Sequence, residues 1–165
     1  MTIIHDRQAA EPATASSYGA MPDTDGANFY EEDFNLGRAL RRCLSPEEFA
    51  HAERILSEAG AVAGGELNRL AMIADKNPPQ LVQFDRRGQR LDRIEKHPAY
   101  REMERIAFER FALAAVSHRD GVLGWPGRMP PLMKYALSYV LIQAEFGLFC
   151  PINMPIGLHH PAPFA

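Results

Sequence analysis

Apolar residues recur every three or four positions after Ser45, and this spacing predicts a helix. The apolar positions are Phe49, Ala52, Leu56 and Ala59, which fall on one helical face. Ser45 can cap the helix, Pro46 suits its first position, and Glu48 can complete a capping box. The pattern therefore predicts a helix that begins at Pro46, and Gly60 predicts its end.

Three further stretches show helical spacing. They predict a second helix at about 65–74, a third at about 98–117 and a fourth at 132–149, the last apolar on most of its circumference. Upstream, the apolar residues from Phe29 to Leu40 predict a short extended segment that leads into a helical turn at about 37–42. The expected fold class is all-α, an up-and-down arrangement of four main helices with one non-helical crossover after the second.

The crossover is predicted by prolines and a turn motif. Pro78 and Pro79 end the second helix because neither donates a backbone hydrogen bond. Residues 81–84 are then short and extended, and residues 85–88 form a turn in which Gly88 suits a positive φ. We expect Leu91 and Ile94 to anchor this loop onto the core.

Composition indicates one domain with an acidic leader. The chain has 165 residues, is 46% hydrophobic and carries a net charge of −3. Seven acidic residues precede position 36 against the single Arg7, so the remainder of the chain carries +3. Residues 1–27 show no apolar periodicity and are expected to stay disordered, because so little burial cannot offset chain entropy.

The cysteines and the N-terminus predict a cytoplasmic protein. Cys43 and Cys150 are the only cysteines, they are far apart, and neither belongs to a CxxC pair. Residues 1–10 are too polar for a signal peptide. The apolar stretch 132–150 is long enough to suggest a membrane span, but Lys134 and Glu145 lie within it, so a buried core helix is the preferred interpretation.

Basic residues between 85 and 97 raise two functional hypotheses. The segment holds Arg86, Arg87, Arg90, Arg93 and Lys96, which a nucleic-acid site would use on phosphates. Three carboxylates are interspersed among them, which favours local ion pairs on a solvated surface. His97 is a candidate base, but no nucleophile or carboxylate partner accompanies it at a recognisable spacing. At a helix start it is better interpreted as a cap or an interface contact.

The remaining candidates favour structural roles. Adjacent His159 and His160 cannot easily share one metal ion. Glu145 is a candidate buried acid, more simply explained by a pairing or capping role, and Cys150 is interpreted as a small buried residue. The chain has no dinucleotide-binding, P-loop or nucleophile-elbow motif. We therefore predict no catalytic, cofactor-binding or metal-binding residue in this chain.

Several motifs follow one another in the order of a known family. They are Asn77-Pro78-Pro79, the Asp-x-x-Gly turn at Asp85, His97-Pro98-Ala99-Tyr100, Lys134 to Tyr139 and Gln143 to Pro151. Over residues 28–154 the chain resembles the N-terminal helical domain of acyl-CoA dehydrogenases, in the branch related to the adaptive-response (DNA-alkylation-response) protein AidB. The resemblance implies a flavoprotein whose FAD, catalytic glutamate and DNA-associated region lie in later domains, while this domain helps wall the acyl pocket and contributes to a tetramer.

The chain departs from that family at Pro155, where a threonine usually precedes the flavin domain. Residues 155–165 form a Pro-rich tail without strand alternation, which cannot begin a sheet domain. The expectation is a truncated domain that binds no FAD and is inactive alone. Its expected partners are the family's flavin and C-terminal domains, and a homo-oligomer stays open.

Two alternatives come from other classes. The chain could instead be a stand-alone helical interaction module that assembles with a full-length relative through the exposed face of its last helix. A DNA-associated alkylation-response factor is the less favoured alternative, and DNA contact is not expected of this segment.

Overall fold

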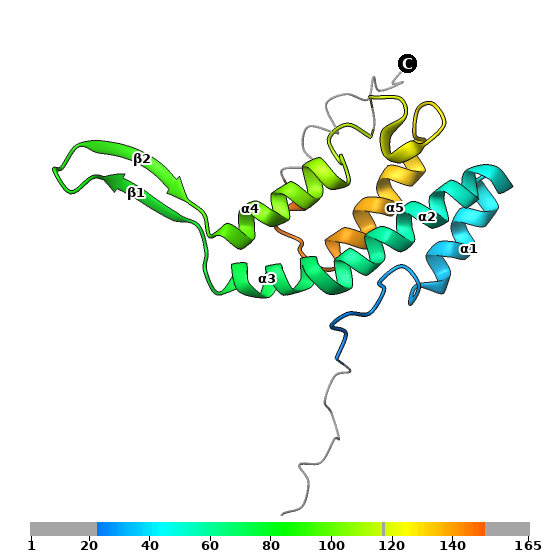
Figure 1. The fold of residues 1–165 in the computed structure, drawn as a ribbon, viewed down its shortest axis with the longest axis horizontal. Helices are drawn as coiled ribbons and strands as arrows, with labels where there is room; N and C mark the ends of the chain where they lie inside the picture. The colour runs from blue at the N-terminus through cyan, green and yellow to red at the C-terminus, as the bar shows by residue number, and fades with distance from the viewer. Residues whose placement is uncertain (1–22, 117, 151–165) are drawn as a thin grey trace, which may run out of the picture.

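The computed structural model describes residues 23–116 and 118–150, which form a helical body with one projecting hairpin (Figure 1). The elements are α1 (Phe34–Cys43), α2 (Pro46–Val62), the π-helical turn η1 (Ala63–Leu67), α3 (Asn68–Asp75), β1 (Gln80–Phe84), β2 (Arg90–Glu95), α4 (Pro98–Arg105), the π-helical turn η2 (Ile106–Arg110), the 3₁₀ turn η3 (Val122–Gly124) and α5 (Pro131–Ile142). Helices dominate, so the predicted all-α class with four main helices is confirmed.

The capping box starts α2 as predicted, but α2 does not stop at Gly60. Ser45 Oγ accepts a hydrogen bond from the Glu48 amide at 3.2 Å, and Glu48 accepts one from the Ser45 amide at 2.9 Å. Beyond Gly60 the helix runs through η1 into α3, which makes one rod from Pro46 to Asp75. The rod tolerates glycine because its interior positions are held by packing as well as by intrinsic helix propensity.

Gly60 and Gly64 allow the N-terminal segment to cross the rod closely. The Gly26 amide donates to the Gly64 carbonyl at 2.7 Å, and the Phe29 amide donates to the Gly60 carbonyl at 3.2 Å. A Cβ at Gly60 would lie 2.0 Å from Asn28 Oδ1, and one at Gly64 would lie 1.8 Å from the Ala27 oxygen. The glycines interpreted as a stop and a junction are therefore contact points in a continuous helix.

The first helix is longer than predicted. It spans the ten residues of α1 and begins at Phe34, which the sequence pattern had placed in an extended segment. Asp33 caps it, since its carboxylate accepts hydrogen bonds from the amides of Asn35 and Leu36, both at 3.0 Å. The cap at Asp33 explains why the helix begins at Phe34, ahead of the helical turn predicted at about 37–42.

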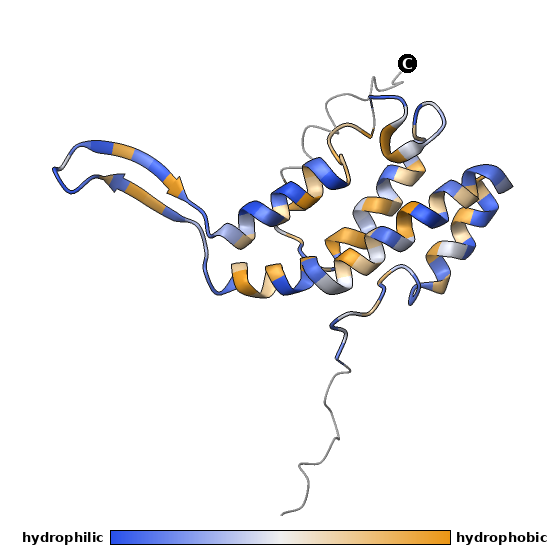
Figure 2. Cartoon of the chain, in the orientation of Figure 1, coloured by the Kyte–Doolittle hydropathy of each residue, from blue (hydrophilic) through white to orange (hydrophobic). Residues whose placement is uncertain are grey.

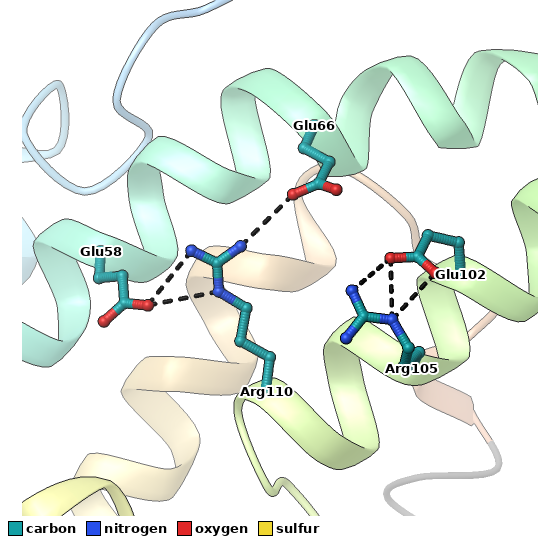
Figure 3. Close-up of polar contacts among 5 residues, drawn as sticks. All are labelled: Glu58, Glu66, Glu102, Arg105 and Arg110. Carbon is teal, nitrogen blue, oxygen red and sulfur yellow. Dashed lines mark hydrogen bonds and ion pairs between the residues drawn. The ribbon is translucent and has the colours of Figure 1, made fainter.

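The core lies where α5 packs across α2 and where α4 packs beside α3. Its fully buried side chains include Leu56, Leu67, Met103, Ile106, Phe111, Leu137 and Leu141. At the rim, Arg110 lies between Glu58 and Glu66 at 3.3 and 3.4 Å and so ties η2 to the rod, while Arg105 binds Glu102 within α4 (Figure 3).

The third and fourth helices end earlier than predicted. The third ends at Arg110, and Ala112 then takes a left-handed φ of 47°. The fourth ends at Ile142, after which a turn brings Leu148 and Phe149 back into the core. Uninterrupted apolar sequence was interpreted as uninterrupted helix, although a chain reversal buries the same residues.

The crossover is a β-hairpin that extends away from the helices, with hydrophobic residues on both strands (Figure 2). The extended segment and the turn are confirmed, and Gly88 has a φ of 80°. The expected anchoring of Leu91 and Ile94 is wrong, because these side chains are 44% and 61% exposed. Apolar identity predicted burial, but the hairpin projects from the body and has no core beneath it in the part of the chain that the structure describes.

Two further expectations concern the membrane and the domain limits. Within the described ranges, no helix combines the length and the apolarity needed to cross a membrane. The domain boundaries at 28 and 154 stay predictions. Residues 1–22 and 151–165 lie outside the described ranges, whereas residues 23–27 of the expected leader are described, and Gly26 among them is hydrogen-bonded to Gly64.

Candidate functional site

A row of exposed apolar side chains follows the outer side of α5 and continues past its end. We call this the α5 face, and it comprises Leu132, Tyr135, Tyr139 and Phe146 of the last helix and its exit, with Phe34 at the start of α1. Phe146 and Phe34 are the most exposed, at 75% and 69%. Single exposed apolar residues are ordinary, but a row of aromatic rings is typical of a contact surface.

A hydrogen bond joins the α5 face to the start of α1. Tyr139 Oη donates to Asp33 Oδ2 at 2.9 Å, so the residue that caps α1 also holds α5. The amide of Leu36, the Tyr139 hydroxyl and the Asn35 amide together hold the pKa of Asp33 below its usual value. The same carboxylate raises the pKa of Tyr139, by its hydrogen bond first and by its charge second.

An open hollow of about 610 Å³ lies beside the α5 face. Phe29, Phe34 and Gln143 line it together with the carboxylates of Asp23, Glu32 and Asp33, and its described lining includes no cation. Such a set of carboxylates would repel the phosphates of FAD or of an acyl-CoA. The hollow therefore does not fit either group.

The inner side of α5 buries two polar side chains. Lys134 is 3% exposed, and within the described chain its ammonium has no carboxylate partner; it lies 5.6 Å from the Tyr135 ring centroid. Burial lowers the pKa of Lys134. One turn later, the buried Ser138 hydroxyl has no hydrogen-bond partner among the described residues. The Ser138 hydroxyl weakens the fold, because burial of a polar group without a hydrogen bond is unfavourable.

The predicted candidates in the hairpin region have structural roles. His97 is a cap, as expected, because its Nδ1 accepts a hydrogen bond from the Ala99 amide at 3.1 Å. Arg90 pairs with Asp92, Arg93 with Glu95 and Lys96 with Glu104, which confirms local ion pairing for these three cations. Across the described residues, Arg86 and Arg87 at the hairpin tip form no ion pair.

The candidates near the end of α5 have no chemical role in the structure. Glu145 is half-buried and accepts a hydrogen bond from the Gly147 amide at 2.7 Å, which is a structural role. The prediction that Cys150 is buried is wrong, since Cys150 and Cys43 are both exposed and free. His159 and His160 lie outside the described residues. The described ranges contain no group of three or more side chains suited to a metal ion.

Sequence reasoning named the exposed face of the last helix as a contact surface for an interaction module, but it did not assign the residues of that face. Tyr135 and Tyr139 are one turn apart, and that spacing could have indicated it. The signal was hidden because apolar residues surround the whole helix, which removes the contrast between an inner and an outer side.

Comparison with known proteins then decides the family. The family model described as the adaptive response protein AidB N-terminal domain matches residues 20–159. The chain belongs to this family. A curated relative, the putative acyl-CoA dehydrogenase AidB of Escherichia coli (strain K12), is 30% identical over 149 residues, which are 85% of this chain and 26% of the relative.

Solved structures share the fold of this AidB-type domain. Caenorhabditis elegans ACDH-11, solved in complex with C11-CoA, superposes with a TM-score of 0.71 at 21% identity, over 94% of this chain and 26% of that one. The apo-form of Bd2924 superposes with a TM-score of 0.69 at 24% identity, over 81% of this chain and 26% of that one. The chain thus spans about a quarter of the length of these relatives.

Proposed function

We propose that this chain serves as the N-terminal helical domain of an FAD-dependent acyl-CoA dehydrogenase-like flavoprotein. The family's reaction is the α,β-dehydrogenation of acyl-CoA thioesters, and its catalytic base and flavin contacts belong to domains that follow the N-terminal one. In this proposal the chain provides no catalytic residue. It provides a rigid helical wall against which the flavin-bearing part of the protein packs.

The α5 face is the observation that carries the proposal. It presents aromatic residues on the outside of a helix whose inner side already forms the core, and within the described chain Tyr135, Tyr139 and Phe146 stay 48% to 75% exposed. Burial of apolar area against another domain is favourable at about 25 cal/mol per Å². The acidic hollow beside the face also supports the proposal that other domains hold the cofactor, because the hollow does not suit a phosphate-bearing group.

Flavin content tests whether the chain works as a wall without chemistry of its own. The purified chain is expected to lack visible flavin absorbance after incubation with FAD, and to show no acyl-CoA-dependent reduction of an electron acceptor. Stoichiometric yellow protein would contradict the proposal.

A second candidate function uses the same surface in another way. The chain would be a separate interaction module that docks on a full-length relative through the α5 face. The face supports this function equally, since an unpartnered aromatic row suits a partner supplied by another polypeptide.

Pull-down with the full-length E. coli relative separates the two functions. The module predicts capture that Phe146→Glu abolishes and that the control Met72→Glu leaves intact, because Met72 is exposed on α3, which contributes no residue to this face. Absence of capture by the unmodified chain would leave only the domain function.

A further inference from the structure

The β1–β2 hairpin has no role in the fold that explains its length. It is a two-stranded sheet whose side chains are exposed except for the half-buried Val82, and none belongs to the core. An isolated two-stranded sheet is marginally stable in water, and three or more strands are generally needed. The outer edge of β2 also offers backbone groups that can pair with another strand.

A bulge changes which side chains of β2 share a face. Val82 lies opposite Arg93, and Phe84 lies opposite Arg90. Between these pairs β1 advances by two residues and β2 by three, so β2 carries one extra residue, and Asp92 in this stretch has a φ of 44°. Val82 and Phe84 share a face, and therefore Arg90 and Arg93 share it too.

The same bulge places Arg90 and Glu95, at the two ends of β2, on one face of the strand. Glu95 alternates with Ile94 and lies on the face of Arg93, which is also the face of Arg90. Leu91 and Ile94 lie on the opposite face. In a regular strand Arg90 and Glu95 would point to opposite faces, because their separation is odd.

The order of residues in β2 is complementary to itself. Two antiparallel copies related by a twofold axis pair only residues that share a face. With the axis between Asp92 and Arg93, Arg90 lies opposite Glu95 of the second copy, and Leu91 lies opposite Ile94 of the second copy. Each pair occurs twice. Opposite charges and apolar pairs placed in this way stabilise a sheet.

The outer edge of β1 lacks this property. Centred on Val82, two copies of β1 would place Gln80 opposite Phe84 and Leu81 opposite Gln83. These are polar–apolar pairs without charge, so the self-complementary edge is that of β2.

We propose that β2 pairs antiparallel with β2 of a second copy of this chain, which joins two hairpins into a four-stranded sheet. A row of like charges on an edge strand would repel a second copy, and such rows protect many natural edges. The charges of β2 alternate in sign instead. The ion pairs within one strand, Arg90 with Asp92 and Arg93 with Glu95, then become contacts between strands.

Charge reversal at the outer pair tests this register. Arg90→Glu sets two carboxylates opposite each other, because its new side chain faces Glu95 of the second copy. Glu95→Arg sets two guanidinium groups opposite each other, because its new side chain faces Arg90 of the second copy. Each clash occurs twice in a homodimer, and both positions avoid the positive φ of Asp92. Arg87→Glu is the matched control, because it makes the same charge change at the hairpin tip, outside the pairing register.

Sedimentation velocity over a concentration series measures the outcome. The unmodified chain and R87E are expected to dimerise alike, and R90E and E95R are each expected to weaken the dimer about tenfold or more. An equimolar mixture of R90E and E95R is expected to restore dimerisation, since the mixed dimer places opposite charges together in both outer pairs and so relieves the like-charge clash of each homodimer. Circular dichroism of each variant checks that the helical body is unchanged.

Two results would overturn the inference. One is that the unmodified chain stays monomeric at ~1 mM, because its dimer affinity would then be lower than this pairing predicts. The other is a mixture of R90E and E95R that associates no better than either variant alone. Phe146→Glu is expected to leave the dimer intact, so failure at the α5 face and failure at β2 are distinguishable.

Discussion

Substitution of Gly64 by alanine tests whether the N-terminal segment is held by close approach to the rod. By helix propensity alone, alanine would stabilise this position by about 1 kcal/mol. The structure predicts the opposite sign. The new Cβ would lie 1.8 Å from the Ala27 oxygen and 2.9 Å from Phe29 Cδ1, so the segment must move by about 1.5 to 2 Å to restore ordinary contact.

That displacement has a calculable cost. It breaks the hydrogen bonds from Gly26 to Gly64 and from Phe29 to Gly60, each contributing about 1 kcal/mol, and overpacking adds about 1 to 3 kcal/mol. After the gain in propensity, the net loss of unfolding free energy is about 2 to 4 kcal/mol, or about 4 to 16 °C in Tm for a chain of this size.

Gly65→Ala is the matched control on the adjacent residue. Its Cβ would meet only Arg69 Nη2, at 3.7 Å, which is an ordinary contact. It is expected to stabilise by about 0.5 to 1 kcal/mol. Urea and thermal unfolding followed by circular dichroism measure both variants. A G64A chain as stable as the unmodified chain would refute the close approach, because propensity would then decide both positions.

Three further variants probe polar groups. Lys134→Met is expected to stabilise by about 1 kcal/mol, since Lys134 is 3% exposed and its ammonium has no carboxylate partner within the described chain. The folded pKa of Lys134 is lowered, so the unfolded chain binds more protons; stability rises between that pKa and about 10.4, and K134M removes this rise. Ser138→Ala is expected to stabilise by about 0.5 to 1 kcal/mol in urea unfolding, because it removes a buried hydroxyl that no described residue hydrogen-bonds. Asp33→Ala is expected to cost about 1 kcal/mol at neutral pH. Because the folded pKa of Asp33 is lowered, its contribution is present above the unfolded pKa and disappears as the pH falls through the folded value, so the two chains should converge in acid.

Local signals in the sequence predicted local structure well. The capping box at Ser45, the turn ending in Gly88 and the cap at His97 depend on residues within a few positions of one another, and each is confirmed. The family resemblance is confirmed too, because it depends on the order of motifs and not on packing.

Features that depend on distant residues were not predictable in this way. Gly60 was interpreted as a helix end because glycine often ends helices. The residues next to it in the sequence do not reveal that residues 26–30 cross the rod at that point. Leu91 and Ile94 were expected to be buried because they are apolar, but a sequence pattern does not say whether a core lies beneath a loop. The residues of the α5 face were not assigned for a related reason, since a helix that is apolar all round does not indicate which side the core occupies.

The projecting hairpin and the helical body are subject to different selection, because only the body must be conserved for folding. Because no hairpin side chain belongs to the core, substitutions there change the folding free energy little, while those in the rod or α5 change it strongly. A surface under weak constraint from folding can diverge quickly without loss of the scaffold. Related chains could therefore acquire different association preferences by changing a few residues of β2, and paralogues in one cell could remain separate assemblies on the same helical body.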